Sequence, residues 1–446
     1  MTSICAAYFI LLFTALNGRL PKYEFRRGEG AASGFGRSVS HMRIMVLTDA
    51  FLPHAGGSRV YYHNLYKNLV AQFPDQVTIL TKKVPGWKEF DQRESTDSFR
   101  IVRHFKPLPN WKVYQLPKII FPFSRALRQA RSNNVDLIHV GDLYPPGVIA
   151  LALKRLLGIP YVAYCHGEEI TQTDQRRYQP IVRNRIYQQA DLVIAACEFA
   201  RRNLLRIGVP EGQVVKITPG VDCKRFSSRV PSPDLVRQFS LYGKKVLLTI
   251  SRLCPRKGHD VVLKAIAKIH PEVRDLRYLI VGEGAEEAKL RQLAFDLGLA
   301  DVVTFVGYVP DSRLPEFYAT CDIFVMANRE EKGDVEGFGM VFLEANASGK
   351  IVIGGRSGGT TDSILDGITG FLVKPGDADE LAATLKRVLL NPGLRMELGE
   401  AGSRRARREF DWATRARQVR EISSQILQHS RIHPIPGGIP TSPSPL

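Results

Sequence analysis

The chain has 446 residues, of which 44% are hydrophobic and 24% charged, a composition typical of a soluble globular protein with room for two domains. Its net charge of +18 predicts an anionic partner, and without zinc-finger spacing or an RNP-like strand the sequence favours phosphorylated substrates or an anionic membrane over nucleic acid. Six scattered cysteines without a Cys-x-x-Cys pair indicate reduced thiols in a cytoplasmic protein.

Residues 1–41 precede the first strand pattern. Their apolar run, 4–16, is shorter than the roughly 20 residues that span a bilayer, and its basic residues follow it, unlike those of a secretory signal. We interpret this N-terminal extension as an over-extended start of a protein that begins at Met42. The alternative is a short membrane anchor with a basic flank.

From Met42 onward, apolar runs typical of buried strands alternate with helical patterns, which predicts an α/β fold with a parallel sheet covered on both faces. Strands are expected at 43–49, 77–82, 99–105, 137–141, 161–165, 192–197 and 214–218. Helices are expected at 57–72, 122–132, 146–157 and 198–206.

A second alternating series follows a Ser- and Pro-containing linker at 227–233. Its strands are expected at 245–251, 277–282, 302–306, 323–327, 351–354 and 370–374. We therefore expect two doubly wound, Rossmann-like domains, at 42–230 and 231–410, with ligands in a cleft at the carboxyl ends of the strands. A helix at 411–430 and a disordered tail at 431–446 complete the chain.

One stretch in the second domain combines two carboxylates with a helix start. Glu336 precedes a Gly337-Phe338-Gly339 turn, and Glu344 lies in the apolar run that begins at Met340. Free amides at a helix beginning near Phe338 would suit a phosphate, and the glycines would let a ligand approach the backbone. The alternative is an acidic N-cap followed by a solvated glutamate.

Three further loops follow expected strands. Gly56 and Gly57 precede a helix, where they would admit a phosphate or sugar or simply make a tight connection. His166 follows the fifth strand, as a substrate contact or a structural histidine. Val309, in Tyr308-Val309-Pro310, could offer backbone groups to a nucleobase.

The loop after strand 245–251 carries three cations. Arg252 and Lys257 lie just ahead of a helix, which suits a pyrophosphate clamp, or alternatively a solvated surface pair. We expect Arg256 to point to solvent. Asp334-Val-Glu336 loosely resembles a metal-binding Asp-x-Asp motif, but these cations and amides can neutralise a diphosphate, so no metal is expected.

Together these pieces resemble the family 4 retaining glycosyltransferases of the GT-B fold, over 42–428. The matching segments are Gly56-Gly57, His166-Gly167, 219–222, 251–258, 281–284 and the Glu336/Glu344 pair, in the family's order. The segment 334–345 is most similar to the phosphatidylinositol-mannoside mannosyltransferase branch. The resemblance implies that the helix at 411–430 crosses back onto the N-terminal domain.

The resemblance also implies residue roles. Arg252 and Lys257 would bind the donor diphosphate, and His166 would lie near the donor sugar. Glu336 would hold a hydroxyl of the transferred sugar and Glu344 the ribose. Backbone at Phe338, Gly339 and Met340 would meet sugar and phosphate, and Gly56 and Gly57 would lie close to diphosphate and acceptor.

Two departures from the family pattern affect what can be carried over. Gly358-Gly-Thr-Thr-Asp362 stands where the family often has Gly-Gly-x-Pro-Glu, so the role of that turn is in doubt. The insertion-like stretch 330–333 alters the approach to Glu336, so the sugar cannot be inherited from the resemblance.

We thus expect a metal-independent hexosyltransferase without a cofactor, using a GDP- or UDP-linked sugar, with a tilt towards GDP-mannose. The expected acceptor is a lipid-linked or glycan hydroxyl, reached in the cytoplasm or on the inner face of the plasma membrane. A nucleotide-sugar epimerase and a non-enzymatic nucleotide-binding protein are the alternatives. Basic residues Lys112, Lys118, Arg125, Arg128 and Arg131, with apolar Ile119, Ile120, Phe121 and Phe123, predict an anionic membrane surface or a solvated helix face.

Overall fold

The computed structural model describes residues 40–49, 51–53, 56–104, 117–173, 179–227 and 229–432. The expectations for the extension before Ser40 and for the tail after 432 lie outside these residues. The described chain forms two compact units. The first contains the chain up to Ala196, Arg201–Ile217 and the segment from Ala413, and the second contains Cys197–Ala200 and Thr218–Trp412.

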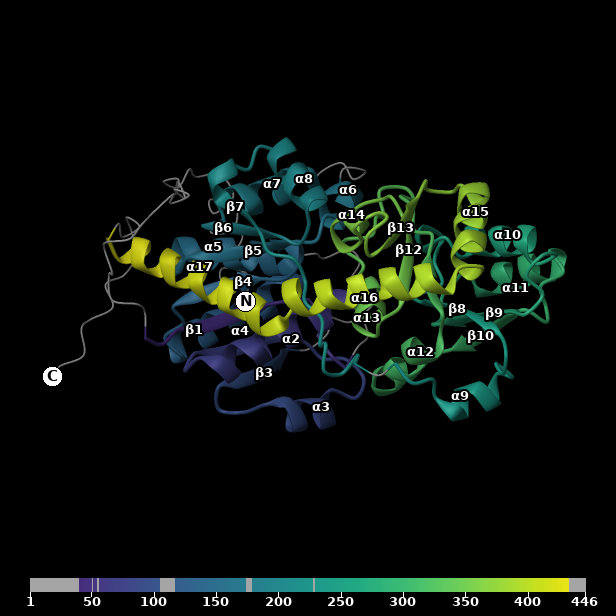
Figure 1. Cartoon of the computed structure of the whole chain (residues 1–446). Coiled ribbons are helices and arrows are strands. Elements are labelled where there is room, and N and C mark those ends of the chain that lie inside the picture. Colours follow the sequence, from purple (N-terminus) through teal and green to yellow (C-terminus); the bar gives the residue numbers. More distant parts are fainter. Residues whose placement is uncertain are drawn as a thin grey trace, which may run out of the picture. The chain divides into compact units, whose positions relative to one another are not determined.

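The first unit is built on a seven-stranded parallel sheet with the strand order β3-β2-β1-β4-β5-β6-β7 (Figure 1). Its strands are β1 (Arg43–Leu47), β2 (Gln76–Lys82), β3 (Phe99–His104), β4 (Leu137–Val140), β5 (Tyr161–Cys165), β6 (Leu192–Ala195) and β7 (Val214–Lys216). All seven strands coincide with expected ones. Strands β4, β5 and β6 are buried along their whole length, as continuous apolar runs predict for a sheet covered by helices.

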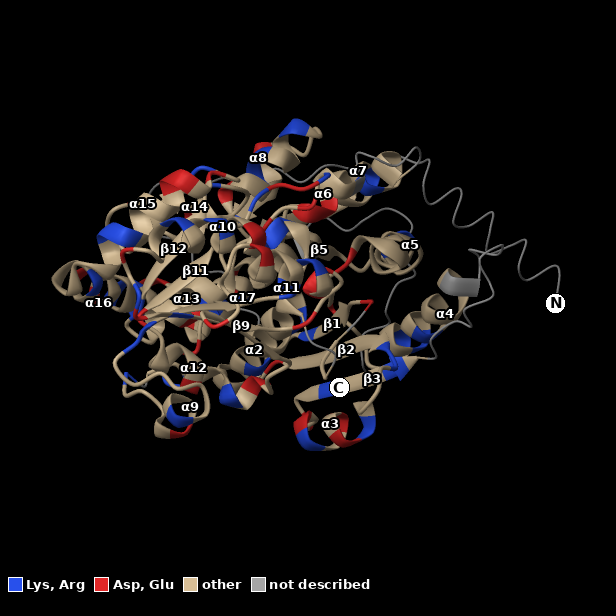
Figure 2. Cartoon of the chain, turned by 90° about the vertical axis from the view of Figure 1, so that its right-hand side faces the viewer, with Lys and Arg blue, Asp and Glu red and all other residues tan. Residues whose placement is uncertain are grey.

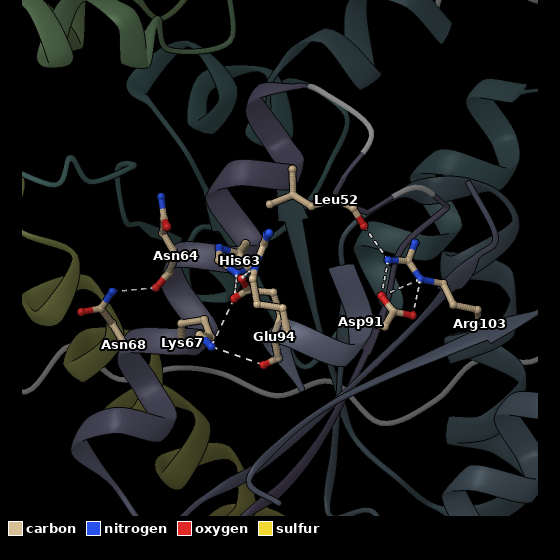
Figure 3. A network of polar contacts seen from close by, with 9 residues as sticks. Leu52, His63, Asn64, Lys67, Asn68, Asp91, Glu94 and Arg103 are labelled. Carbon is tan, nitrogen blue, oxygen red and sulfur yellow. Dashed lines mark hydrogen bonds and ion pairs between the residues drawn. The ribbon is translucent and has the colours of Figure 1, made fainter. Parts of the chain in front are cut away.

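Helices connect these strands and pack on the sheet. They are α2 (Gly57–Gln72), α3 (Trp87–Glu94), α4 (Pro117–Ser132), α5 (Val148–Leu157), α6 (Glu168–Thr173), α7 (Gln179–Gln189) and α8 (Glu198–Arg206), with short turns η1 (Leu143–Gly147) and η2 (Glu211–Gln213). Helix α3 was not expected from the sequence, because it is short and only weakly apolar. It is held by polar contacts instead. The buried Arg103 of β3 pairs with Asp91, and Glu94 Oε2 lies 3.0 Å from His63 Nε2 and 3.3 Å from Lys67 Nζ (Figure 3).

The last helix, α17 (Trp412–Ile432), belongs to the first unit from Ala413 onward. Its Arg420 Nε donates to Asp75 at 2.8 Å, and Ser423 Oγ lies 3.3 Å from Nε2 of His139, in the middle of β4. Burial lowers the pKa of His139 to about 3, so the imidazole is neutral in the core. The terminal helix therefore packs on the N-terminal sheet.

The second unit has a six-stranded parallel sheet with the order β10-β9-β8-β11-β12-β13. Its strands are β8 (Lys245–Ile250), β9 (Leu276–Val281), β10 (Val303–Gly307), β11 (Ile323–Met326), β12 (Ile351–Gly355) and β13 (Gly370–Val373). Its helices are α9 (Pro233–Gln238), α10 (His259–Ile269), α11 (Glu287–Asp296), α12 (Leu314–Thr320), α13 (Met340–Ala347), α14 (Thr360–Ser363), α15 (Ala378–Leu389) and α16 (Pro392–Glu409), with turns η3 (Pro255–Lys257) and η4 (Asp311–Arg313). Helices α10, α11 and α15 enclose one apolar core with the sheet (Figure 1).

The units divide at Ile217 and Thr218, before the boundary expected at 230. The segment after Thr218 bonds within the second unit: Val221 N donates to Phe410 O at 2.7 Å, and Arg225 pairs with Asp311 at 2.8 Å. The Ser- and Pro-containing stretch thus lies inside the second unit. The expected cleft between the domains stays a prediction.

None of the described helices combines the length and apolarity needed to span a bilayer.

Candidate functional site

The loop that follows β8 turns two of its three cations inward. Turn η3 leads into α10, and within it Arg256 and Lys257 are both buried, whereas Arg252 is exposed. Gly258 makes this possible, because its φ of +71° is left-handed and a Cβ there would lie 1.9 Å from the carbonyl oxygen of Ala327. The loop therefore sits directly against the end of β11.

Both buried cations meet the carboxylate of Glu336. Arg256 Nη1 donates to Glu336 Oε2 at 2.5 Å, and Lys257 Nζ donates to the same oxygen. Burial opposes the ionisation of Glu336, but Lys257 and Arg256 outweigh it and hold its pKa at about 2. The cluster is thus an ionised carboxylate between two cations.

The expectation that Arg256 points to solvent is wrong. Its side chain is buried, and its Nε also lies 3.0 Å from Asp334 Oδ1. The reason is tertiary: the chain that carries Asp334 and Glu336 passes beside η3 and supplies two carboxylates to the guanidinium. Asp334 and Glu336, the pair that resembles a metal motif, therefore both contact Arg256. Within the described residues there is no group of three or more His, Cys, Asp or Glu that could hold a metal ion.

The glycine-rich turn after β12 supports Glu336 from behind. Gly359 N donates to the Glu336 carbonyl at 2.8 Å. A Cβ on Gly358 would lie 2.3 Å from that oxygen, and one on Gly359 would lie 2.0 Å from the Gly337 carbonyl. Although this turn departs from the family pattern, its backbone contacts fix the position of the loop that carries Glu336.

Helix α13 begins at Met340, two residues later than expected, after Gly339 in a left-handed conformation with φ +82°. Gly339 has no side chain that could cap the first-turn amides. The position of a Cβ on Gly339 would be 3.6 Å from Cγ of Glu336, so this helix start lies beside the carboxylate. Phe338 is buried, with its ring 5.9 Å from that of Phe410. Amides with partial positive charge and two cations therefore converge on one place.

Glu344 lies one turn into α13 and accepts a hydrogen bond of 2.7 Å from the Tyr318 hydroxyl. Burial raises the pKa of Glu344 to about 7, although the Tyr318 bond opposes the rise. The carboxyl group of Glu344 therefore gains or loses its proton near neutral pH. Val309 follows β10 and is half-buried beside the exposed Tyr308.

The remaining predicted residues lie in the first unit. Gly56 precedes α2 and its carbonyl accepts from Arg59 N and Val60 N, both at 3.2 Å, and Gly57 is the first residue of the helix. The loop between β1 and α2 is anchored by Arg103 Nη2, which donates to Leu52 O at 2.5 Å (Figure 3). His166 follows β5, and its Nε2 lies 2.9 Å from the Tyr62 hydroxyl of α2.

The structure thus brings together Lys257, Glu336, Gly339 and Met340, with Glu344 on the next turn, in the second unit. Gly56, Gly57 and His166 belong to the first unit, and their proximity to that cluster stays a prediction. Two residues of the described units were not predicted from the sequence: Arg256, whose signal was its place beside Lys257, and Tyr62, which lies five residues after Gly57.

Sequence models of two protein families match most of the described chain. Residues 55–225 match the sequence model of Glycosyltransferase Family 4, and residues 234–405 match that of Glycosyl transferases group 1. A GDP-mannose-dependent alpha-(1-6)-phosphatidylinositol monomannoside mannosyltransferase from Mycolicibacterium smegmatis is 30% identical over 390 residues, which cover 85% of this chain and 98% of the relative. A GDP-mannose-dependent monoacylated alpha-(1-6)-phosphatidylinositol monomannoside mannosyltransferase from Corynebacterium glutamicum is 26% identical over 385 residues. These residues cover 85% of this chain and 97% of the relative.

Solved structures agree on the fold. Sucrose-phosphate synthase from Thermosynechococcus elongatus superposes with a TM-score of 0.74 at 25% identity, covering 87% of this chain and all of that one. The Anabaena HepE protein, solved in complex with UDP, gives 0.71 at 22% identity and covers 86% of this chain. The two Rossmann-like units and the terminal helix are those of the GT-B fold, as expected from the sequence. The chain belongs to the glycosyltransferase family that the group 1 and family 4 models define, and it is a glycosyltransferase.

Proposed function

We propose that this enzyme transfers mannose from GDP-mannose, with retention of configuration and without a metal ion, to a hydroxyl of a phosphatidylinositol mannoside. The observation that carries the proposal is the cluster of Arg256, Lys257 and Glu336 at the start of α13. The two relatives from Mycolicibacterium smegmatis and Corynebacterium glutamicum, which match this chain over 98% and 97% of their own length, are by name GDP-mannose-dependent enzymes acting on such lipids, which supports this donor and acceptor.

The proposed chemistry is leaving-group stabilisation. The bond between the anomeric carbon and the phosphate oxygen breaks, leaving negative charge on GDP and positive charge on the sugar. Lys257, the exposed Arg252 and the amides at Gly339 and Met340 stabilise the diphosphate, and such electrostatic stabilisation is usually the largest catalytic contribution. The acceptor oxygen bonds to the same face of the anomeric carbon, and its proton passes to a departing phosphate oxygen.

The proposed roles of the remaining groups are those that the resemblance to family 4 glycosyltransferases implies. Glu336 accepts a hydrogen bond from a sugar hydroxyl while Arg256 keeps it ionised, and Glu344 accepts from the ribose. His166 contacts the donor sugar, Val309 offers its backbone to the base, and Gly56 and Gly57 lie by diphosphate and acceptor. No side chain of the described residues is assigned as a nucleophile.

A donor panel tests the proposal. Purified enzyme is incubated with GDP-mannose, GDP-glucose, UDP-glucose or UDP-galactose, with and without phosphatidylinositol monomannoside, and products are resolved by mass spectrometry and NMR. With the acceptor present, we expect an α-mannosylated lipid from GDP-mannose and from none of the other three donors. The rate should be unchanged in excess EDTA. An isomerised donor formed without acceptor would instead show an epimerase, and transfer from a UDP-sugar or loss of activity in EDTA would contradict the donor or the metal independence.

Nucleotide binding should depend on the ionisation of Glu344. Its raised pKa means that the carboxyl group is neutral below about pH 7, and a neutral carboxyl accepts hydrogen bonds from ribose hydroxyls much more weakly than a carboxylate does. We expect GDP affinity in calorimetry to fall about tenfold between pH 8 and pH 6, because only about one molecule in ten is ionised one unit below the pKa. Glu344→Gln should bind GDP weakly with no such pH step, and a step that persists in this variant would contradict the assignment.

The acceptor proposal adds a membrane-facing surface on α4. Arg125, Arg128 and Arg131 are exposed along this helix, and Phe121 is 63% exposed near its start. Basic positions colour parts of the α4 ribbon blue in Figure 2. The expectation that Ile119 and Phe123 share this surface is wrong, because both are buried in the core of the first unit. Lys112 and the side chain of Lys118 lie outside the described residues.

Vesicle flotation tests this surface. Each basic residue at an anionic surface contributes about 1 kcal/mol, so changing Arg125, Arg128 and Arg131 to Gln should weaken binding to phosphatidylinositol vesicles by roughly 10²-fold. The matched control changes the exposed Arg404, Arg407 and Arg408 of α16 to Gln, which removes the same charge and should leave flotation nearly unchanged. Equal losses in both variants, or binding insensitive to salt, would contradict a specific role of α4.

A further inference from the structure

The Tyr62 hydroxyl lies between two groups at the carboxyl edge of the first sheet. Its oxygen is 2.8 Å from the carbonyl oxygen of Gly141, just after β4, and 2.9 Å from Nε2 of His166, just after β5. The Tyr62 side chain is buried, at 1% exposure. One phenol thus bridges the ends of two neighbouring strands.

The two contacts determine where the protons are. A tyrosine hydroxyl carries one hydrogen, and a backbone carbonyl can only accept, so that hydrogen is donated to Gly141. The Tyr62 oxygen must then accept the hydrogen of the second contact, which places a hydrogen on Nε2 of His166. In a neutral imidazole the other nitrogen, Nδ1, is consequently an acceptor. Burial raises the pKa of Tyr62 well above its ordinary value, so the phenol keeps its hydrogen at neutral pH.

The surroundings hold this geometry in place. A Cβ on Gly141 would lie 2.8 Å from the Tyr62 ring, so only glycine lets the ring reach this carbonyl. The Glu169 carboxylate accepts from His166 N at 3.0 Å and from Gly167 N at 2.9 Å, which fixes the backbone of the histidine. The Tyr61 ring stands edge-on to the imidazole, with centroids 5.4 Å apart and planes at 84°.

A second pair in the same unit shows what a purely structural histidine looks like. One turn further along α2, the Tyr66 hydroxyl lies 2.7 Å from Nδ1 of His139. Ser423 Oγ donates to Val419 O at 2.6 Å, so its 3.3 Å contact with Nε2 of His139 uses it as an acceptor. Both nitrogens of His139 are therefore satisfied inside the core, whereas Tyr62 occupies only Nε2 of His166.

We propose that Tyr62 is a positioning residue for glycosyl transfer: it locks His166 in the Nε2–H tautomer, so that Nδ1 accepts a hydrogen bond from a hydroxyl of the donor sugar. This rests on the proposed contact between His166 and the donor. Without the phenol the ring samples both tautomers, and in one of them Nδ1 carries a hydrogen and cannot accept from the sugar.

Nitrogen NMR of enzyme labelled with ¹⁵N-histidine tests the tautomer directly. Signals are assigned by comparison with His166→Asn. In the wild type we expect a pyrrole-type shift for Nε2 and a pyridine-type shift for Nδ1 of His166. In Tyr62→Phe both nitrogens should move towards an averaged shift, and in the matched control Tyr66→Phe the His166 signals should stay in place. A wild-type Nδ1–H tautomer, or signals unchanged in Tyr62→Phe, would overturn the proposal.

Kinetics on the same proteins test the consequence. Tyr62→Phe should lower kcat/KM for the donor about tenfold, because losing this hydrogen bond frees the orientation of the imidazole as well as its tautomer, whereas Tyr66→Phe should stay within about twofold. Asparagine at 166 can place an amide oxygen near the Nδ1 position, so adding Tyr62→Phe to His166→Asn should cost little more. Full additivity would overturn the proposal, as would an unchanged rate in Tyr62→Phe.

The two readouts separate this proposal from the proposed function. The wild-type spectrum is assigned with His166→Asn and does not require Tyr62→Phe, so it decides the tautomer even if Tyr62→Phe does not fold. Should another nucleotide sugar replace GDP-mannose in the donor panel, the tautomer and the kinetic comparison are measured with that donor. The identity of the donor can thus be wrong while the role of Tyr62 is right, and the reverse also holds.

Discussion

Replacing Lys257 with methionine should reduce glycosyl transfer by about 10²–10³-fold, the typical loss when one preorganised group that stabilises developing charge is removed. The ammonium group is buried beside Glu336 and the start of α13, where a departing diphosphate would be little screened by water. Methionine keeps most of the side-chain volume, and Arg256 remains to compensate Glu336. The measurement is kcat and kcat/KM for purified enzyme of verified fold.

Lys264→Met is the matched control for this substitution. Lys264 is exposed on α10, the helix that follows Lys257, so its loss removes the same charge from the same region without touching the cluster. We expect activity within about twofold of the wild type, as for most exposed substitutions. If both variants lost the same activity, the effect would come from net charge, and Lys257 would have no specific role.

Replacing Gly258 with alanine should disable the enzyme without any change in a charged group. The left-handed φ of +71° costs alanine about 1–2 kcal/mol. The added Cβ would also lie 1.9 Å from the Ala327 carbonyl oxygen, so the loop must move away from β11 and take Lys257 with it. A displacement of about 1 Å at a catalytic group can cost 10²-fold in rate, which is the loss we expect in kcat.

Gly243→Ala separates strain from displacement. Gly243 has a similar φ of +66° in the same unit, but an added Cβ there meets no atom within 4 Å. Thermal unfolding should show a loss of about 1–2 kcal/mol for Gly243→Ala with normal activity, and a larger loss with low activity for Gly258→Ala. Equal activity in the two variants would show that the loop tolerates movement and that its exact position is not needed.

Much of the fold could be predicted from the sequence because buried parallel strands leave a strong local pattern. Strands such as β5 and β11 are continuous apolar runs, and α2 was expected at its observed residues. The short helix α3 was not predicted because ion pairs of its Glu94 with Lys67 and of its Asp91 with Arg103, rather than an apolar stripe, hold it in place.

The candidate site was predictable where chemistry and spacing are local. Glu336, Gly339 and Glu344 lie within one stretch, and Lys257 lies in a basic loop that ends a strand. The partner of Arg256 could not be read in this way, because its guanidinium meets a carboxylate 80 residues further along the chain. For the same reason nothing local indicated that burial would raise the pKa of Glu344 to about 7 against the opposing hydrogen bond from Tyr318.

A crystal structure of the enzyme with bound GDP-mannose tests the central claim most directly. We predict the diphosphate within hydrogen-bonding distance of Lys257 Nζ and of the amides at Gly339 and Met340, with Glu336 on the mannose and Glu344 on the ribose. A nucleotide sugar bound away from the start of α13, or with its diphosphate turned from Lys257, would contradict the account.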